Sequence, residues 1–598
     1  MNIPQLFLDR ARRNPDADAF FVMDALDPAQ GGAPAAAHPG WRRYSYGDSR
    51  AQITELAMGL VEAGVEDGDR VAILGETSHL WVAADLAVLC IGAVTVGLYP
   101  TLTGPQLAFQ LEHSGAKAIL IDSAPLLEKL RPHLASLPGL RLCFAMRPGL
   151  GLPMAPRRAA PPGWLERRVG AVSADALATL VYTSGTTGEP KGVMLHHRHF
   201  VAVVRSSEAA LPLAPGDRSV VFLPLAHSLQ RFALYRGLAE GVVGYFAPTI
   251  EALPPTLLTA RPQVLLSVPR MLEKIKSSAE ATAARRGPRA AKVYAWAIEV
   301  GLQHAAFTRE GRRPPLGLRA QRRTAEALVF RKIKAKLGGE LQMVISGGAA
   351  LHPEVGAWFE AIGVAVREGW GLTETCAPAT TNRRERHALG TVGPAMPGVE
   401  VKVAADGELM VRSPGNFSGY WRDPEASAAA FDADDFFYTG DLGSIDREGF
   451  VRITGRKKDI IVTAGGKNVA PNPIEGDLTG GLIGQAVVIG DERPFLVALL
   501  TLDAEQAEAQ ATAAGWTGGP ELWKDQPAVQ AAVAARVEAV NASRAPFEQI
   551  KRWRLLAAPF TVEGDEMTPS LKLRRAQIAR SRAADIAQLY AAPVSGGR

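Results

Sequence analysis

The chain has 598 residues and a mass of 63.6 kDa, which is more than one hydrophobic core supports and predicts two or three domains. Apolar residues make up 47% and charged residues 21% of the sequence, and this composition excludes a disordered or fibrous chain. The net charge of +5 is a mild excess that does not indicate a nucleic-acid-binding protein, but it leaves room for a local basic patch. Three separated cysteines, Cys90, Cys143 and Cys376, favour neither a disulfide framework nor a thiolate metal site and fit a reducing cytoplasm.

The first twenty residues predict an amphipathic helix rather than a signal peptide, because no apolar segment follows the charges. The apolar run Leu80–Pro100 approaches the length of a membrane span, but Asp85 and Gly92 interrupt it. A buried helix to about Gly92, followed by a strand VTVGLYP, explains this run better than the alternative of a membrane span.

Helical patterns and short apolar strands alternate along the first part of the chain. The helices AQITELAMGLVEAG, LWVAADLAVLC and PQLAFQLEHSG precede the strands VAILG, VTVGLYP and KAILIDS. This alternation predicts an α/β fold with largely parallel sheets that are flanked by helices.

Three segments have the composition of loops, linkers or insertions: residues 27–40, 147–170 and 285–336. The third holds fourteen Lys and Arg against three Glu. Solvated helix faces are one interpretation of this charge. Peripheral contact with anionic lipids at the inner face of a membrane is the other.

The pattern changes after Gly390. Alternating apolar residues and Gly turns predict a small β-rich subdomain over about 390–457. We expect an N-terminal domain over 1–457 and a mobile α+β domain over 458–598. In the latter, 525–542 and 546–556 are predicted helices.

The stretch YTSGTTGEPKG (182–192) follows the strand pattern ATLVY and concentrates glycine and hydroxyl residues before Lys191. Gly185 and Gly188 permit a turn with inward N–H groups, and Lys191 adds a positive charge, so the stretch suits a polyphosphate. It is not the GxxxxGK[ST] motif. A hairpin turn with an incidental surface lysine is the alternative. The hydroxyl groups come from Thr183, Ser184, Thr186 and Thr187.

Further motifs follow in order: FLPLAHSLQRF (222–232), SVPRMLEKI (267–275), ISGGAAL (345–351), REGWGLTET (367–375), YTGDLG (438–443), GRKKDIIVTAGGKN (455–468) and MTPSLKLRR (567–575). With these motifs the chain resembles the AMP-forming acyl-CoA synthetases of the adenylate-forming superfamily, most closely the bacterial long-chain fatty-acid–CoA ligases. The resemblance covers nearly the whole chain. It implies a large N-terminal AMP-binding domain, a small mobile C-terminal domain, and formation of acyl-AMP and then acyl-CoA.

The resemblance also implies roles in nucleotide binding. Trp370 would stack on adenine, although relatives usually have Tyr there. Thr373 would donate to the α-phosphate, Glu374 would hold Mg²⁺, and Asp441 with Arg456 would bind the ribose. Further residues implied at the nucleotide are Gly347, Gly348, Ala349, Glu368 and Gly369.

Lys572 is the residue that the resemblance implies for adenylation, because an ammonium there would screen the carboxylate from the α-phosphate. Leu571 stands where the common family form has Gly. Lys458 would be the hinge between the domains. Gly465 and Gly466 would leave room for the pantetheine arm of coenzyme A.

The resemblance places His227, Gln230 and Arg231 at the gate of the acyl pocket. Arg231 stands where some relatives have an aromatic gate residue, and its guanidinium could hold a phosphate or another carboxylate.

The leading interpretation is a medium- to long-chain fatty-acid–CoA ligase that uses ATP, Mg²⁺ and coenzyme A. The alternatives are a fatty acyl-AMP ligase that loads a carrier protein, a ligase for aromatic or branched acids, and a nucleotide-binding protein without turnover. We expect no nucleic-acid partner, and a homodimer stays open.

Overall fold

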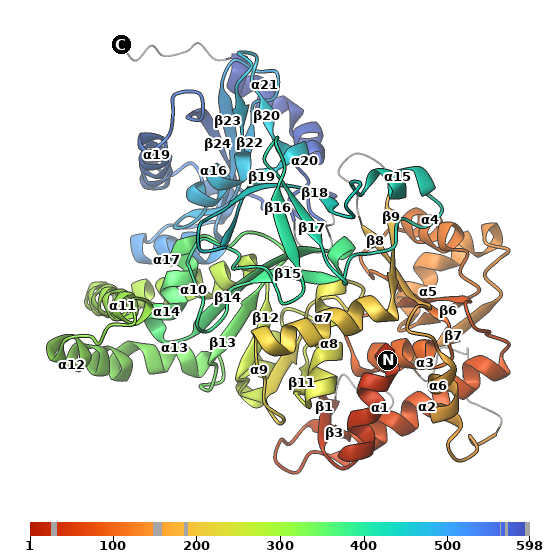
Figure 1. Cartoon of the computed structure of the whole chain (residues 1–598). Helices are drawn as coiled ribbons and strands as arrows, with labels where there is room; N and C mark the ends of the chain where they lie inside the picture. Colours follow the sequence, from red (N-terminus) through yellow and green to blue (C-terminus); the bar gives the residue numbers. More distant parts are fainter. Residues whose placement is uncertain (25–32, 148–157, 184–188, 563, 569–571, 592–598) are drawn as a thin grey trace.

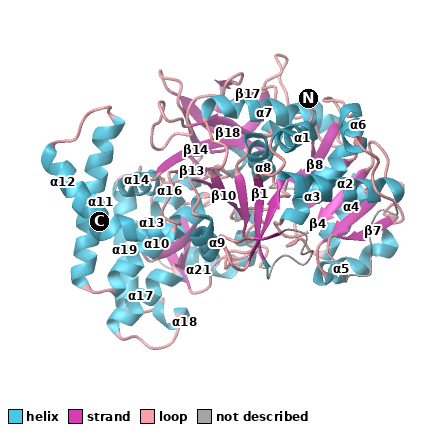
Figure 2. Cartoon of the chain, turned by 90° about the horizontal axis from the view of Figure 1, so that it is seen from below, coloured by secondary structure: helices cyan, strands magenta, loops and turns pink. Residues whose placement is uncertain are grey.

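The structure is a computed structural model that describes residues 1–24, 33–147, 158–183, 189–562, 564–568 and 572–591. Figure 1 shows three sheets with covering helices in the larger part of the molecule, followed by a small antiparallel sheet and a C-terminal α+β unit. The helices lie on the outside of the sheets in both views (Figures 1 and 2). This arrangement is the predicted α/β fold.

The six-stranded sheet has the order β7-β6-β4-β5-β8-β9 and is parallel except for the antiparallel hairpin of β8 and β9. Its strands are β4 (Arg70–Leu74), β5 (Val94–Leu98), β6 (Ala118–Ile121), β7 (Leu142–Ala145), β8 (Leu177–Thr183) and β9 (Lys191–His196). The associated helices are α2 (Tyr46–Glu62), α3 (His79–Cys90), α4 (Gly104–Ser114), α5 (Ala124–Leu130) and α6 (Trp164–Ala171).

All residues of α3 and β5 are buried, which explains the apolar run that begins at Leu80. A buried helix followed by a strand is therefore the correct interpretation of that run. Within the described ranges, no helix combines the length and the apolarity needed to cross a bilayer.

Two further sheets complete the larger part of the molecule. One has the order β10-β11-β1-β3-β2 and the other β12-β13-β14-β15. The strands are β1 (Asp18–Met23), β2 (Ala33–Pro34), β3 (Trp41–Ser45), β10 (Arg218–Val221), β11 (Val243–Phe246), β12 (Val264–Ser267), β13 (Met343–Ser346), β14 (Ala365–Leu372) and β15 (Ala377–Thr381). The helices are α1 (Ile3–Arg13), α7 (His197–Ala210), α8 (Ser228–Glu240), α9 (Leu253–Ala260), α10 (Pro269–Arg285), α11 (Pro288–Arg309), α12 (Leu316–Ala325), α13 (Arg331–Lys336) and α14 (Pro353–Ile362).

The predicted β-rich stretch forms an antiparallel sheet of order β16-β17-β18-β19. Its elements are β16 (Glu400–Val403), β17 (Glu408–Arg412), α15 (Pro424–Ala429), β18 (Phe437–Ile445) and β19 (Val451–Arg456). In Figure 1 this sheet lies between the C-terminal unit and the body.

The C-terminal unit has its own hydrophobic clusters, which consist only of residues from Ile461 onward. Its strands are β20 (Ile461–Val462), β21 (Asn468–Val469), β22 (Ile483–Ile489), β23 (Leu496–Leu502) and β24 (Ile550–Leu556). Its helices are α16 (Pro471–Leu478), α17 (Ala504–Ala514), α18 (Pro520–Trp523), α19 (Pro527–Ala542), α20 (Arg575–Ser581) and α21 (Ala583–Ala591). The exact boundary after residue 457 stays a prediction.

Polar contacts fix the C-terminal unit against the body. The Gln506 side-chain amide on α17 donates to the Ser277 carbonyl oxygen on α10 at 2.9 Å. His352 Nε2 lies 3.1 Å from Asp477 Oδ1. Arg270 donates to the carbonyl oxygen of Gly484.

Two sequence predictions of local structure are wrong. The stretch 546–556 was expected to be a helix, but Ile550–Leu556 is a strand that pairs in parallel with β23. Pairing with a buried strand overrides the helix propensity of its Lys, Arg and Leu residues. The expected linker 147–170 overlaps α6, whose Leu165 and Val169 are buried.

Candidate functional site

The strands β14, β18 and β19 bring three predicted residues together. The Trp370 indole N–H donates to Asp441 Oδ2 at 2.7 Å, and Arg456 Nε donates to Asp441 Oδ1 at 2.6 Å. Asp441 and Arg456 face each other in the register of the β18–β19 pair. The Asp441 carboxylate is thus held in a fixed orientation by an indole and a guanidinium.

A second group joins the start of β9 to the short turn Thr373–Thr375. Lys191 Nζ lies 3.0 Å from Asp423 Oδ2 and 4.9 Å from the centre of the Tyr420 ring. The Tyr420 hydroxyl donates to Glu374 Oε1 at 3.1 Å. Lys191 and Glu374 therefore belong to one connected set of side chains, although neither contacts the other directly.

Burial raises the pKa of Glu374 above its ordinary value, and the hydrogen bond from Tyr420 and the charge of Arg456 act in the opposite direction. A single oxygen ligand of this kind suits a hard cation that takes its other ligands from phosphate and water. No group of three or more His, Cys, Asp and Glu residues that could hold a metal occurs in the part of the chain that the structure describes. Glu374 thus fits Mg²⁺ that is shared with a nucleotide, and it does not fit a closed metal site.

Lys572 reaches this region from the far end of the sequence. Its side chain keeps contact with solvent, but surrounding protein removes enough water to lower its pKa. The charge of Arg456 lowers that pKa further, and those of Asp441 and Glu374 raise it. The Lys572 ammonium therefore lies within electrostatic range of both predicted nucleotide carboxylates.

His227 is the N-cap of α8, where its Nδ1 accepts from the Leu229 N–H at 3.2 Å. Burial, followed by the charge of Lys572, lowers the pKa of His227 to about 4. The imidazole is therefore neutral at physiological pH. Ser228, the next residue, places its hydroxyl 3.4 Å from that of Thr373.

The glycine-rich turn after β13 lies against Leu229 of α8. Gly348 has a φ of +86°, which favours glycine, and a Cβ on Gly347 would lie 3.2 Å from the Leu229 side chain. Ala349 follows and is exposed. On β14, the buried Glu368 carboxylate accepts from the Leu351 N–H at 3.0 Å, so its oxygen is committed to the protein.

Some predicted residues stay without a structural test. Ser184, Gly185, Thr186, Thr187 and Gly188 lie outside the described residues, which resume at Glu189. The strands on either side place Thr183 opposite Lys191.

The hinge and coenzyme A candidates lie at the surface of the C-terminal unit. Lys458 is exposed in a short turn directly after β19. Gly466 has a φ of +71°, and no heavy atom lies within 4 Å of a Cβ built on Gly465 or Gly466.

The structure corrects the gate prediction for Arg231. Its side chain is fully buried, and its guanidinium donates to Asp85 Oδ1 at 2.6 Å, Thr179 Oγ1 at 2.7 Å and the Tyr235 hydroxyl at 2.9 Å. It therefore holds a carboxylate of the protein core and cannot hold a phosphate in this conformation. Gln230 is also buried, and its side-chain oxygen has no hydrogen-bond partner among the described residues.

Tyr420 and Asp423 are functional candidates that the sequence predictions missed. The string SGYWRDPE (418–425) contains a turn signal and both side chains, but nothing in the string indicates that they reach Lys191 and Glu374.

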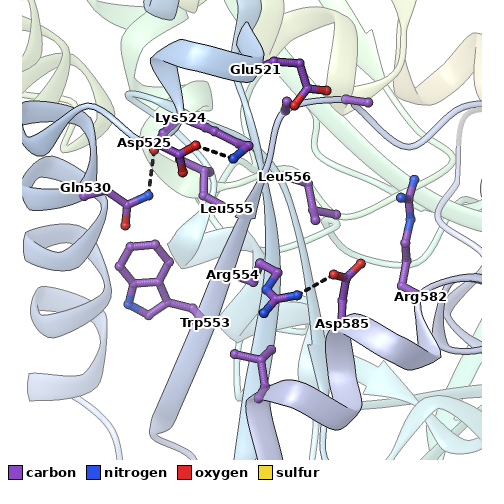
Figure 3. Close-up of a pocket in the computed structure, with 13 residues that line it drawn as sticks. Glu521, Lys524, Asp525, Gln530, Trp553, Arg554, Leu555, Leu556, Arg582 and Asp585 are labelled. Carbon is purple, nitrogen blue, oxygen red and sulfur yellow. Dashed lines mark hydrogen bonds and ion pairs between the residues drawn. The ribbon is translucent and has the colours of Figure 1, made fainter. Parts of the chain in front are cut away.

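A cavity of about 520 Å³ lies elsewhere, between α18, α19, β24 and α21 (Figure 3). Four of its charged residues pair with one another: Arg554 with Asp585 at 2.5 Å and Lys524 with Asp525 at 2.6 Å. None of the predicted site residues lines it. This cavity is therefore not the predicted nucleotide site.

Comparisons with known proteins agree with this geometry. Residues 7–421 match the family described as AMP-binding enzyme, and residues 458–593 match the AMP-binding enzyme C-terminal domain. Long-chain-fatty-acid–CoA ligase FadD15 of Mycobacterium bovis is 37% identical over 92% of this chain and 92% of its own length. Long-chain-fatty-acid–CoA ligase ACSBG1 of Bos taurus is 30% identical over 90% of this chain and 79% of its own.

Solved structures share the fold at lower identity. The anthranilate CoA ligase AuaEII in complex with anthranoyl-AMP has a TM-score of 0.73 and 18% identity, and the match covers 98% of both chains. The A-PCP didomain of a carboxylic acid reductase from Segniliparus rugosus in complex with AMP has a TM-score of 0.74 and 22% identity over 99% of this chain and 82% of that chain.

Proposed function

The chain belongs to the AMP-forming acyl-CoA synthetases of the AMP-binding enzyme family and is a fatty-acid–CoA ligase, and from this premise we propose how its residues divide the reaction. A fatty carboxylate is a poor electrophile because its leaving group would be oxide. Attack on the α-phosphate of ATP converts it to acyl-AMP with release of pyrophosphate. A thiol then displaces AMP and yields a thioester.

Both steps bring negative charges together, so the residues act by positioning and by electrostatic stabilisation. Lys191 and the loop before it hold the β- and γ-phosphates, and Thr373 donates to the α-phosphate. Asp441, oriented by Arg456, accepts hydrogen bonds from the ribose hydroxyls, and the flat face of Trp370 stacks on adenine. Glu374 would hold Mg²⁺, which neutralises phosphate charge when bound.

Lys572 carries the adenylation step. Its ammonium screens the incoming carboxylate from the α-phosphate and stabilises the charge of the transition state. The observation that supports this assignment is that Lys572 lies close enough to Glu374, Asp441, Arg456 and His227 for their charges to act on one another. Because His227 is neutral, it adds no second fixed charge to the path of the incoming fatty carboxylate.

For the second step we propose coenzyme A as the acceptor, which passes the exposed turn at Gly465 and Gly466. That turn has open space around both glycines, as a pantetheine arm requires. The C-terminal unit would turn about Lys458 between the two steps.

The test separates the half-reactions. Lys572→Ala should lower fatty-acid-dependent exchange of pyrophosphate into ATP by about 100-fold or more, which is the usual cost of losing a group that stabilises transition-state charge. Thioester formation from supplied acyl-AMP and coenzyme A should change by less than about threefold, since the phosphate is already activated at that stage. Equal loss of both half-reactions would remove Lys572 from this role.

A further inference from the structure

The positive charge of the protein is concentrated in one segment, residues 285–336, which we name the basic hairpin. It contains the end of α10 and the helices α11, α12 and α13, and it carries fourteen Lys and Arg against three Glu, a net charge of +11. Because the whole chain has a net charge of +5, the remainder is net negative, at −6. In both views α11 and α12 lie at the edge of the molecule (Figures 1 and 2).

One face of the basic hairpin is fixed to the body. A Cβ on Gly301 of α11 would lie 2.5 Å from the Ala361 carbonyl oxygen of α14, so the two helices approach closely. The Trp358 indole N–H donates to the Tyr294 hydroxyl at 2.8 Å. These contacts hold the basic hairpin in place and determine which face stays outside.

Most of the basic residues in the basic hairpin are exposed and unpaired. Four of the fourteen basic residues pair with carboxylates, namely Arg309, Arg312, Arg322 and Lys334. The other ten are exposed and pair with no carboxylate of the described residues: Arg285, Arg286, Arg289, Lys292, Arg313, Arg319, Arg323, Arg331, Lys332 and Lys336.

Large apolar side chains lie among these charges. Leu316 at the start of α12 is 80% exposed, and Leu328 and Val293 are 48% and 40% exposed. Leu316, Arg319 and Arg323 recur at three- and four-residue spacing and so lie on one face of α12. An exposed leucine beside exposed arginines suits the boundary between lipid headgroups and acyl chains.

We propose that the basic hairpin docks the enzyme on an anionic lipid bilayer, with the ten unpaired basic residues against the headgroups and Leu316 inserted at the acyl boundary. The charge complementarity between the basic hairpin and anionic headgroups does not depend on the proposed function. The choice of lipid rather than another polyanion also rests on the exposed leucine and on the proposed function, because fatty-acid substrates partition into bilayers. An RNA or DNA partner would gain little from Leu316.

The test is sedimentation of the full-length protein with two kinds of vesicle. One kind consists of phosphatidylcholine alone, and the other also contains about 30 mol% phosphatidylglycerol, which gives a strongly negative surface. We expect binding only to the anionic vesicles and its loss at high salt. The variant Arg319→Glu/Arg323→Glu should bind at least about tenfold more weakly, since each basic residue near such a surface contributes about fivefold. The matched control Arg141→Glu/Arg447→Glu reverses two exposed arginines outside the basic hairpin and should bind like the wild type.

A second arm tests insertion. Leu316→Ser should weaken binding to anionic vesicles several-fold, whereas Leu522→Ser, at a leucine that is 60% exposed in the C-terminal unit, should have no effect. Equal binding of the Arg319→Glu/Arg323→Glu variant and its control would overturn the proposal. A DNA duplex of about 20 base pairs is long enough to span the basic hairpin. Tighter binding to this duplex than to vesicles would also overturn the proposal, in favour of a nucleic-acid partner. Pyrophosphate exchange in vesicle-free buffer tests the proposed function separately, because it needs no surface.

Discussion

Lys191, the single lysine of the phosphate loop, is held by Asp423 before any nucleotide arrives. The ion pair measures 3.0 Å and both side chains are partly exposed. Asp423 also accepts from the Ala426 N–H at 2.9 Å through its other oxygen and so caps α15. A polyphosphate must therefore compete with Asp423 for the Lys191 ammonium.

The variant Asp423→Asn should remove this competition and keep the cap, because asparagine is an equally good N-cap residue. We expect the KM for ATP to fall by about twofold to fivefold, which is the range for a partly exposed ion pair. The control Asp432→Asn removes the partner of Lys402, at 2.7 Å, outside the predicted site and should leave KM unchanged. An unchanged or raised KM in Asp423→Asn would contradict the competition.

Glu368 makes stability depend on pH. Burial raises its pKa to about 7 from an ordinary value of 4.5. Its folded pKa is above the unfolded one, so its contribution to stability is full below pH 4.5 and is lost as the pH rises through 7.

Glu368→Gln keeps the hydrogen-bond acceptor for Leu351 and removes the titration. The free energy of unfolding of the variant should rise relative to that of the wild type by up to about 3 kcal/mol between pH 5 and pH 8. Urea unfolding at both pH values measures this difference. A difference that is the same at pH 5 and pH 8 would show that Glu368 does not titrate in this window.

At the scale of the elements, the position of α11 depends on a close approach to α14. Gly301→Ala would place a methyl group 2.5 Å from the Ala361 carbonyl oxygen, so α11 must move away from α14. We expect a loss of about 1–3 kcal/mol in the free energy of unfolding, as for other overpacked cores.

Gly317→Ala is the matched control for this prediction. Gly317 lies on α12, and no heavy atom lies within 4 Å of its Cβ position. Alanine there should stabilise the protein by up to about 1 kcal/mol through helix propensity. Equal effects of the two changes on thermal unfolding would mean that the contact at Gly301 does not limit packing.

Elements formed by continuous apolar runs were predictable from the sequence. The helix and strand after Ser78 and the strand before the phosphate loop correspond to α3, β5 and β8. The strand β24 was not, because Lys551, Arg552 and Arg554 favour a helix when the neighbouring β23 is unknown.

The residues of the candidate site also fall into two groups, those that a local string indicates and those that only the fold reveals. Glu374, Asp441 and Lys572 lie in distinctive local strings, so a single sequence indicates them. Arg231 was misassigned because its partner Asp85 is 146 residues away, and only the fold shows that this charge is already neutralised. Tyr420 and Asp423 were missed because their partners, Glu374 and Lys191, are also distant in the sequence.

For the whole molecule, the contact between α10 and α17 is one of those that hold the C-terminal unit, which carries Lys572, against the body. A short bismaleimide link between Ser277→Cys and Gln506→Cys, whose native side chains hydrogen-bond at 3.2 Å, should fix this arrangement. Cys143 should be replaced by Ser in this variant, because Cys90 and Cys376 are buried and Cys143 is only partly so.

The linked protein should keep pyrophosphate exchange within about threefold and lose thioester formation from acyl-AMP by about tenfold or more, since the second step needs the C-terminal unit to turn. Each single-cysteine variant treated with the same reagent is the control. Full rates of both half-reactions in the linked protein would mean that no such turn is required.

The separation of +11 in the basic hairpin from −6 in the rest of the chain makes the molecule a large electric dipole. In the field of a negatively charged plane such a dipole experiences a torque before any contact forms, within roughly a Debye length of 8 Å at physiological salt. The positive end turns forward, and the acidic remainder is repelled. The collision geometry is then selected by long-range forces, and every other face of the protein stays open to coenzyme A and ATP in the surrounding water.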